Sequence, residues 1–250
     1  MDADEVLAVL HATVDAVAAS LDGLVEWRLA DDRAHHGQYT HDQVADAAAI
    51  AVLGPTGLAI LSEESGLRSG TLPVTVVVDP VDGSTNAARG LPWWATSLCA
   101  VDREGPWVAL VSDQVSGRRW SAIRGRGAAC DGVPFARPPT PPMNGSIIGL
   151  GGLPPFHFGW SQFRSLGAIA LDLCAVADGR LDSYTHCVAD EVAEWDYLGG
   201  LLICQEAGAY VVDVLGRDLV VLDPFARRTP CAAGDEALLA EVVAARRRFP

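Results

Sequence analysis

One short segment constrains this chain more than any other: a β-branched run followed by two carboxylates, a proline and a glycine. Residues 74–78 read Val-Thr-Val-Val-Val, and Asp79-Pro80-Val81-Asp82-Gly83-Ser84-Thr85-Asn86 follows at once. β-branched residues favour strands, whereas proline and glycine interrupt them. We therefore expect a strand over 74–78 that ends at Asp79, then a tight turn in which Asp79 and Asp82 converge on one side.

The residues after this turn can begin a helix. The first N–H groups of a helix lack partners within the helix and attract anions. The backbone amides of Gly83, Ser84 and Thr85 are therefore expected to point toward an anion such as phosphate. The same residues also suit an ordinary surface turn with an Asp or Ser helix cap, and the pattern alone leaves both interpretations open.

Two further acidic clusters lie at the expected ends of secondary-structure elements. Ser62-Glu63-Glu64-Ser65 follows a predicted strand over 58–61, and Glu194-Trp195-Asp196 opens a predicted helix. Each cluster alone is typical of solvated acids or of a helix N-terminus. Taken with the central segment, they supply carboxylates from three separated parts of the chain. Mg²⁺ prefers oxygen ligands, so such a set could hold more than one ion.

The charge balance narrows the classes of partner. The formal net charge is -14, and all 18 basic residues are arginines. A surface of this sign repels nucleic acid and anionic membranes, so neither is expected as a partner. A phosphate ester would enter a carboxylate-lined cleft only if bound cations reversed the local potential. Acidity and phosphate chemistry together therefore imply a metal.

The order of predicted elements indicates a mixed fold in two parts. An α+β region over 1–136 and an α/β region over 143–250 are separated by a proline-rich linker at 137–142. Six scattered cysteines and an acidic start favour a cytoplasmic protein without a signal peptide. The predicted helices cover 5–24, 42–53, 168–177 and 196–207, and the predicted strands cover 58–61, 74–78, 95–101, 107–113, 147–150 and 211–214.

The three acidic clusters together resemble the signature of the inositol monophosphatase family, a group of Mg²⁺-dependent, lithium-sensitive phosphatases. That signature has a GEE-like pair, then DP(I/V)DGT(T/N), then a distal WD followed by small residues. This chain has Ser-Glu-Glu-Ser at 62–65, the central segment at 79–86, and Trp-Asp-Tyr-Leu-Gly-Gly at 195–200. The resemblance spans nearly the whole chain and implies a layered αβαβα sandwich of two subdomains and a homodimer.

The resemblance also implies a site for two or three Mg²⁺ ions. Asp79 would bridge two of them, and the ligands would be Glu63, Asp79, the Val81 carbonyl, Asp82 and Asp196. A water held by Glu63 and Ser84 would attack phosphorus, with Asp42 bonded to the Ser84 hydroxyl. The family usually has Thr at the position of Ser84, and Ser keeps the hydroxyl. Asp42 alone also suits an ordinary helix N-terminus.

Substrate identity is less constrained than reaction class. Gly167-Ala168-Ile169 resembles a Gly-Thr-Ala segment that contacts substrate hydroxyls in the family, and Ala168 lacks the hydroxyl of Thr. Glu191 and His186 are further candidates for substrate contact. The expected reaction is hydrolysis of a polyol or sugar phosphate such as inositol-1-phosphate. Histidinol phosphate, fructose 1,6-bisphosphate and 3'-phosphoadenosine 5'-phosphate are alternative substrates, and a non-catalytic regulator on this fold is the alternative from another class.

Overall fold

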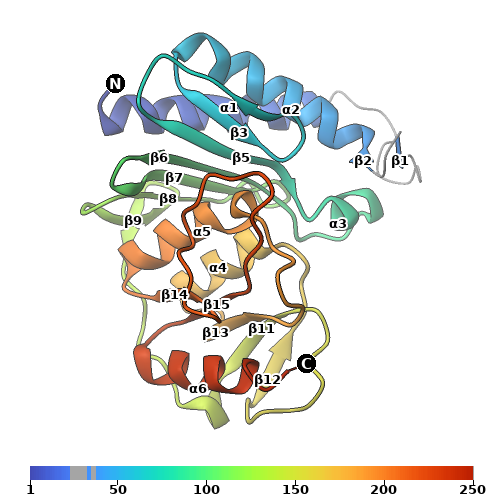
Figure 1. The fold of residues 1–250 in the computed structure, drawn as a ribbon, viewed down its shortest axis with the longest axis vertical. Helices are drawn as coiled ribbons and strands as arrows, with labels where there is room; N and C mark the ends of the chain where they lie inside the picture. The colour runs from blue at the N-terminus through green and yellow to red at the C-terminus, as the bar shows by residue number, and fades with distance from the viewer. Residues whose placement is uncertain (23–32, 35–37, 250) are drawn as a thin grey trace.

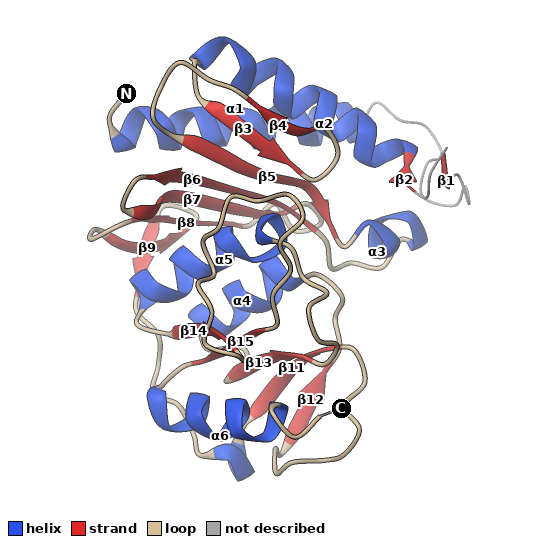
Figure 2. Ribbon diagram, in the orientation of Figure 1, coloured by secondary structure: helices blue, strands red, loops and turns tan. Residues whose placement is uncertain are grey.

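The structure is a computed structural model that describes residues 1–22, 33–34 and 38–249. These residues form five layers, in the order helices, sheet, helices, sheet, helix (Figures 1 and 2). The predicted αβαβα sandwich is therefore confirmed. The helices are α1 (Ala3–Asp22), α2 (Thr40–Leu53), α3 (Ser84–Arg89), α4 (Ile169–Ala177), α5 (Glu194–Ala207) and α6 (Glu236–Arg246).

The first layer consists of α1 and α2, packed on one face of the larger sheet. In α1 the residues Val6, Leu10, Val14, Val17 and Leu21 are all buried. Their spacing of three or four residues places them on one stripe of the helix, which explains why this segment packs flat against a sheet. The helix predicted over 5–24 is observed to Asp22, and its last two residues lie outside the described part of the chain.

The larger sheet has eight strands, and a two-stranded sheet of β1 (Arg33–Ala34) and β2 (Gln38–Tyr39) stands apart from it. Among the described strands of the larger sheet, only β3 and β5 run parallel, and the other neighbours are antiparallel. Its strands, in spatial order, are β10 (Val133–Phe135), β9 (Gly127–Cys130), β8 (Arg119–Ile123), β7 (Gly105–Asp113), β6 (Ala95–Asp102), β5 (Thr75–Asp82), β3 (Ala59–Ser62) and β4 (Gly66–Arg68).

The end of β5 differs from the sequence prediction. We expected the strand to stop at Asp79, but it continues through Pro80 to Asp82. Pro80 is tolerated there because the register with β6 shifts between Asp79 and Asp82, and irregular pairing accommodates a residue without an N–H group. The Thr96 hydroxyl donates to the Pro80 carbonyl at 2.8 Å. The two carboxylates therefore lie on a bulged strand end rather than in a free turn.

The smaller sheet has five strands and lies between α4 and α5 on one side and α6 on the other (Figure 1). β11 runs parallel to β12 and β13, whereas β15 is antiparallel to β13 and β14. Its spatial order is β12 (Gln162–Arg164), β11 (Ile147–Gly151), β13 (Ser183–His186), β15 (Pro230–Ala233) and β14 (Tyr210–Asp213). The sequence predicted β11 and β14 but not the other three strands or α6.

Helices α4 and α5 fill the space between the two sheets. α4 is buried along its whole length, and most of α5 is buried as well. The hydrophobic cluster around them contains residues from both sheets, such as Val111 and Ala232. Residues 136–142 contain neither helix nor strand, and the division into two subdomains at this proline-rich segment stays a prediction. Within the described residues, no helix has the length and apolar character of a membrane span.

Candidate metal and phosphate site

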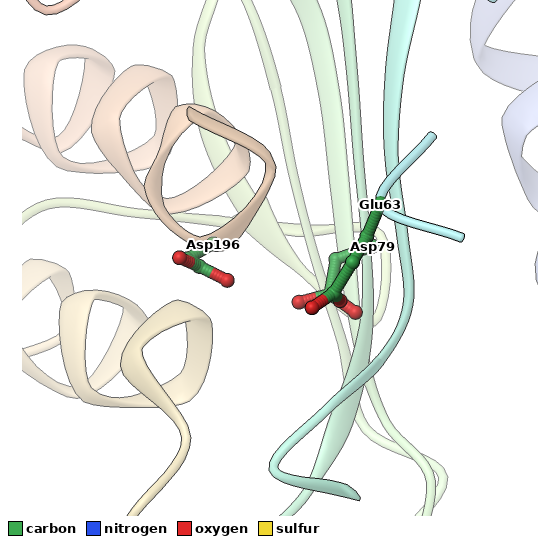
Figure 3. A group of neighbouring side chains, drawn as sticks. All are labelled: Glu63, Asp79 and Asp196. Carbon is green, nitrogen blue, oxygen red and sulfur yellow. The ribbon is translucent and has the colours of Figure 1, made fainter. Parts of the chain in front are cut away.

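Three carboxylates from distant parts of the chain meet at one end of the larger sheet (Figure 3). Glu63 follows β3, Asp79 lies on β5, and Asp196 is in the first turn of α5. One oxygen of each lies within 4.8 Å of the others. In Figure 3 the Glu63 and Asp79 side chains lie next to each other, and the Asp196 side chain faces them from the helix.

The strand register explains why Glu63 and Asp79 are adjacent. β3 and β5 are parallel neighbours in which Ser62 is paired with Val78. The next residue of each strand is therefore at the same level, and the Glu63 N–H donates to the Val78 carbonyl at 3.1 Å. Parallel strands bring their carboxyl ends to the same edge of a sheet, and ligand sites commonly form there.

Helix α5 brings the third carboxylate to this edge. It packs against the sheet and begins there, after the N-cap residue Ala193. Asp196 accepts the Ala193 N–H at 2.8 Å, and this bond fixes one of its oxygens. An acid in the first turn also interacts favourably with the helix dipole. Asp196 therefore reaches the carboxylate cluster from the start of α5.

The electrostatics of the three carboxylates fit a bound divalent cation. Burial, followed by the charges of Glu63 and Asp82, raises the pKa of Asp79 well above its usual range. Burial raises the pKa of Asp196 to about 6. The pKa of Glu63 is raised by burial first and by the charge of Asp196 second. In the described part of the chain, no arginine forms an ion pair with any of the three. Crowded oxygen ligands without a paired cation suit Mg²⁺.

Asp82 lies close to this group but is held by a different contact. Its Oδ2 accepts the Ala170 N–H at 2.7 Å, in the first turn of α4. The N-cap residue of α4 is Ala168, which has no side-chain acceptor, so Asp82 caps this helix from another part of the chain. Asp82 does not belong to the three-carboxylate group within 4.8 Å, and its predicted role as a ligand of a second ion stays a prediction.

Gly83 allows the segment from 167 to 168 to approach the strand end. Its φ is +90°, and a Cβ atom there would lie 3.1 Å from the Ala168 Cβ and from the Gly167 carbonyl. A side chain at this position would therefore be strained and crowded. The predicted substrate segment, including the buried Ile169, thus lies directly beside the predicted phosphate-binding turn.

The turn from 81 to 85 has the geometry of a helix start. The first helical bond of α3 runs from the Ala87 N–H to the Gly83 carbonyl, so the amides of Ser84 and Thr85 precede the helical ladder. The Ser84 hydroxyl donates to the Val81 carbonyl at 2.9 Å. The carbonyl predicted to bind metal is thus a hydrogen-bond acceptor here, and its role as a ligand stays a prediction.

Asp42 lies in the first turn of α2, beside Ser84. Burial raises the pKa of Asp42 to about 6, while a hydrogen bond with the Ser84 hydroxyl and one from the Tyr39 N–H lower it. One hydroxyl proton cannot serve two acceptors at once, so Ser84 can donate either to Asp42 or to the Val81 carbonyl. The predicted neighbourhood of Asp42 and Ser84 is present in the structure, and their catalytic roles stay predictions.

The two other predicted substrate residues form a chain of hydrogen bonds. His186 lies 2.7 Å from the exposed Glu191 through Nε2, and 3.0 Å from the Tyr184 hydroxyl through Nδ1. Burial lowers the pKa of His186, while the bond to Glu191 raises it. The charge of Glu191 also contributes to raising the pKa of Asp196, so Glu191 lies within electrostatic reach of the carboxylate group.

Two residues that organise the site were not predicted from the sequence. Asn86 donates through Nδ2 to the Leu166 carbonyl at 2.7 Å and to the Trp93 carbonyl at 2.8 Å, and so joins α3 to the predicted substrate segment. Asp46, one helical turn after Asp42, accepts hydroxyls that flank Glu63. The spacing of four residues between the two acids on a predicted helix was the available signal for Asp46.

Comparisons with known proteins agree with this arrangement. The family model described as "Inositol monophosphatase family" matches residues 40–249 of this chain. A fructose-1,6-bisphosphatase of Pyrococcus furiosus is 31% identical over 207 residues, covering 81% of this chain and 80% of that protein. A Nus factor SuhB of Salmonella typhimurium is 31% identical over 235 residues, covering 86% and 82%. An extragenic suppressor structure from Pyrococcus furiosus has a TM-score of 0.85 at 25% identity, covering 96% and 100%.

Proposed function

The chain belongs to the inositol monophosphatase family, and from this premise we propose that it hydrolyses the phosphomonoester of a small polyol or sugar with Mg²⁺ as cofactor. The observation that supports the proposal most directly is the meeting of Glu63, Asp79 and Asp196, with oxygens within 4.8 Å of one another. These carboxylates would hold the cation, with Asp82 and the Val81 carbonyl completing the site. Bound Mg²⁺ would polarise the phosphoryl group and acidify a coordinated water.

The side chains of Ser84 and Asp42 would handle the proton of the attacking water. With a pKa of about 6, Asp42 is mostly ionised at neutral pH and can accept the Ser84 hydroxyl proton. The Ser84 oxygen is then free to accept a hydrogen bond from the water. A proton path from water through Ser84 to Asp42 would then need no change in the fold.

The backbone amides of Gly83, Ser84 and Thr85 would hold the phosphate oxygens, because amides at a helix start attract anions. The segment from 167 to 169 and Glu191 would face the rest of the substrate. Ala168 offers no hydroxyl, so one hydrogen bond available to relatives with Thr is absent. A missing polar contact of this kind weakens discrimination between substrates that differ in one hydroxyl.

The test is phosphate release from purified protein, with and without Mg²⁺. The substrates are inositol-1-phosphate, fructose 1,6-bisphosphate, histidinol phosphate and 3'-phosphoadenosine 5'-phosphate. We expect Mg²⁺-dependent turnover of at least one, and a decrease of about 10²-fold in kcat for Ser84→Ala, as is typical when a proton-transfer group is removed. Absence of Mg²⁺-dependent release from all four esters contradicts the proposal.

A non-catalytic regulator on this fold is the competing function. It would not need an intact cation site, yet Glu63, Asp79 and Asp196 are all present and converge. An Asp82→Asn variant distinguishes the two, because an enzyme loses Mg²⁺-dependent turnover and a regulator is unaffected.

Partners and assembly follow from the same proposal. We propose that the protein is a cytoplasmic homodimer. We also propose that it does not bind nucleic acid, because its net charge of -14 repels the phosphate backbone. One relative is named Nus factor SuhB, which makes an RNA-binding assay the direct check of the absence of a nucleic-acid partner. Analytical ultracentrifugation checks the dimer.

A further inference from the structure

Helix α2 carries a second buried carboxylate that the proposed reaction does not use. Asp46 is 7% exposed and lies one helical turn after Asp42. Its Oδ1 accepts two hydroxyls, from Ser62 at 2.5 Å and from Ser65 at 3.2 Å. The first distance is at the short limit for an O–H···O bond, and the second lies just beyond the long limit, so Ser62 makes the stronger contact.

The two serines bracket Glu63 in the chain. Ser62 immediately precedes it, and Ser65 follows two residues later. Ser62 also accepts the Glu64 N–H at 3.3 Å, so its hydroxyl bridges the turn to α2. On the other side, the Glu63 N–H is bonded to the Val78 carbonyl of β5. The backbone that carries Glu63 is therefore held from two directions, by the sheet and by Asp46.

Glu63 depends on this support more than the other two carboxylates do. Asp79 accepts the Val81 N–H at 2.9 Å, and Asp196 accepts the Ala193 N–H at 2.8 Å. Within the described residues, no backbone N–H holds the Glu63 carboxylate in this way, and Glu63 is the most exposed member of the group. Its position therefore depends on the backbone of the turn and on the side-chain hydrogen bond with Asp79.

Ser62 is also where this chain differs from the signature that it resembles. A GEE-like pair has Gly before the two glutamates, and Gly offers no hydroxyl to a carboxylate on the neighbouring helix. The serine at 62 is fully buried and provides that contact. A buried hydroxyl needs a partner, and Asp46 supplies it.

We propose that Asp46 is a positioning residue for the cation site, acting on Glu63 through the hydroxyls of Ser62 and Ser65. Because α2 also bears Asp42, one helix then sets both the cation ligand and the group beside Ser84. This inference rests on the proposed cation site, and only the part that concerns turnover also requires the proposed reaction. Residues that support metal ligands in this way typically change affinity by 10- to 100-fold when removed.

The experiment measures Mg²⁺ affinity by calorimetry and by the Mg²⁺-dependent rise in Tm, alongside kcat and KM. We expect Asp46→Ala to weaken Mg²⁺ binding about tenfold, in the range for groups that support metal ligands. Asp46→Asn keeps an oxygen acceptor for both hydroxyls, so its Mg²⁺ affinity should stay within about threefold of that of the parent. In a double-mutant cycle, Ser62→Ala should add little to Asp46→Ala, because both remove the same contact.

Asp213→Asn is the matched control, since Asp213 is a buried carboxylate that bonds its own loop away from the site. It should lower stability without changing Mg²⁺ affinity. The proposal is overturned if Asp46→Ala destabilises the fold but binds Mg²⁺ like the parent, or if Asp46→Asn is as damaging as Asp46→Ala. If Asp46→Ala does not fold, Asp46→Asn and Ser62→Ala carry the test. If the parent protein shows no phosphatase activity but the variants show the expected changes in Mg²⁺ affinity, the proposed function is contradicted and the positioning role of Asp46 stands.

Discussion

Asp79 and Asp213 are both buried aspartates near the end of a strand, yet their surroundings differ in one respect. Asp213 meets a cation: its Oδ2 accepts Arg217 Nε at 2.8 Å, and its Oδ1 accepts the Thr229 N–H at 2.9 Å. Burial alone would raise its pKa, but these bonds outweigh burial and lower the pKa to about 2. Asp79 has acidic neighbours instead, and burial and their charges raise its pKa.

This difference separates a structural carboxylate from a ligand. In the Asp213 group the folded protein supplies its own counter-charge, and Arg217 also reaches Asp190. In the Asp79 group the fold brings like charges together and provides no arginine ion pair among the described residues. Such an arrangement costs stability unless a cation from solution offsets it.

The largest effect is expected for Asp79→Asn. Removing the central carboxylate should lower Mg²⁺-dependent kcat/KM by about 10³-fold or more, which corresponds to about 4 kcal/mol. The pKa of Asp79 in the folded state lies above that in the unfolded chain, so its ionisation costs stability as pH rises through the folded value. Metal-free Asp79→Asn should therefore have a higher Tm than the parent at pH 8. A lower Tm would contradict the view of Asp79 as an uncompensated charge.

The next effect is expected for Asp213→Ala, with the opposite sign on stability. Its removal leaves Arg217 and the Thr229 N–H without their partner, and the free energy of unfolding should fall by about 2 to 4 kcal/mol in a urea titration. The folded pKa is depressed, so this stabilisation is present above about pH 4, the ordinary value, and is lost as pH falls toward 2. An unchanged unfolding midpoint would show that the group is not structural.

A third, smaller effect is expected on the pH dependence of Mg²⁺ binding. Protons compete with the cation for carboxylates of raised pKa, such as Asp196 at about 6. Affinity should fall about tenfold between pH 8 and pH 5.5, close to 1.4 kcal/mol. Calorimetry in buffers of different ionisation enthalpy should detect proton release at pH 6. Binding without proton release would contradict the raised pKa values.

The smallest effect is expected for Arg217→Lys. Lysine keeps the positive charge but cannot reproduce the paired contacts of the guanidinium with Asp213. We expect a loss of about 1 kcal/mol in the free energy of unfolding, because Arg217 is partly exposed and its ion pairs are screened. Mg²⁺ affinity should not change. A change in Mg²⁺ affinity would mean that the two groups are coupled.

The fold was predictable where the sequence has strong periodicity. The stripe along α1, the β-branched run of β5 and the alternation in the second half predicted these elements, whereas the αβαβα layers were predicted from the family resemblance. The end of β5 was not predictable, because a proline usually ends a strand and only the shifted pairing with β6 lets this one continue. Strands such as β13 and β15, with Ser, Thr, Cys and Ala, carry too little pattern to separate them from loops.

The candidate site was predictable to the extent that motifs mark carboxylates. The sequence indicated Glu63, Asp79 and Asp196 as ligands, and the structure brings these three together. It did not indicate that Asp82 caps α4, because that contact joins residues 88 positions apart. The spacing from Asp42 marks Asp46 as a candidate, but its contact with Ser62 could not be predicted, because Ser62 lies on a different element.

The parallel pairing of β3 and β5 limits how this protein can change in length. Glu63 and Asp79 share a level only because Ser62 is paired with Val78, and one inserted residue moves a strand by about 3.3 Å. An insertion in either strand would therefore carry one carboxylate out of reach of the other. The segment from 69 to 74, which connects β4 to β5, lies outside this pairing, so an insertion there would not by itself shift the register of β3 and β5. Tolerance to insertions is thus distributed unevenly along this short stretch of chain.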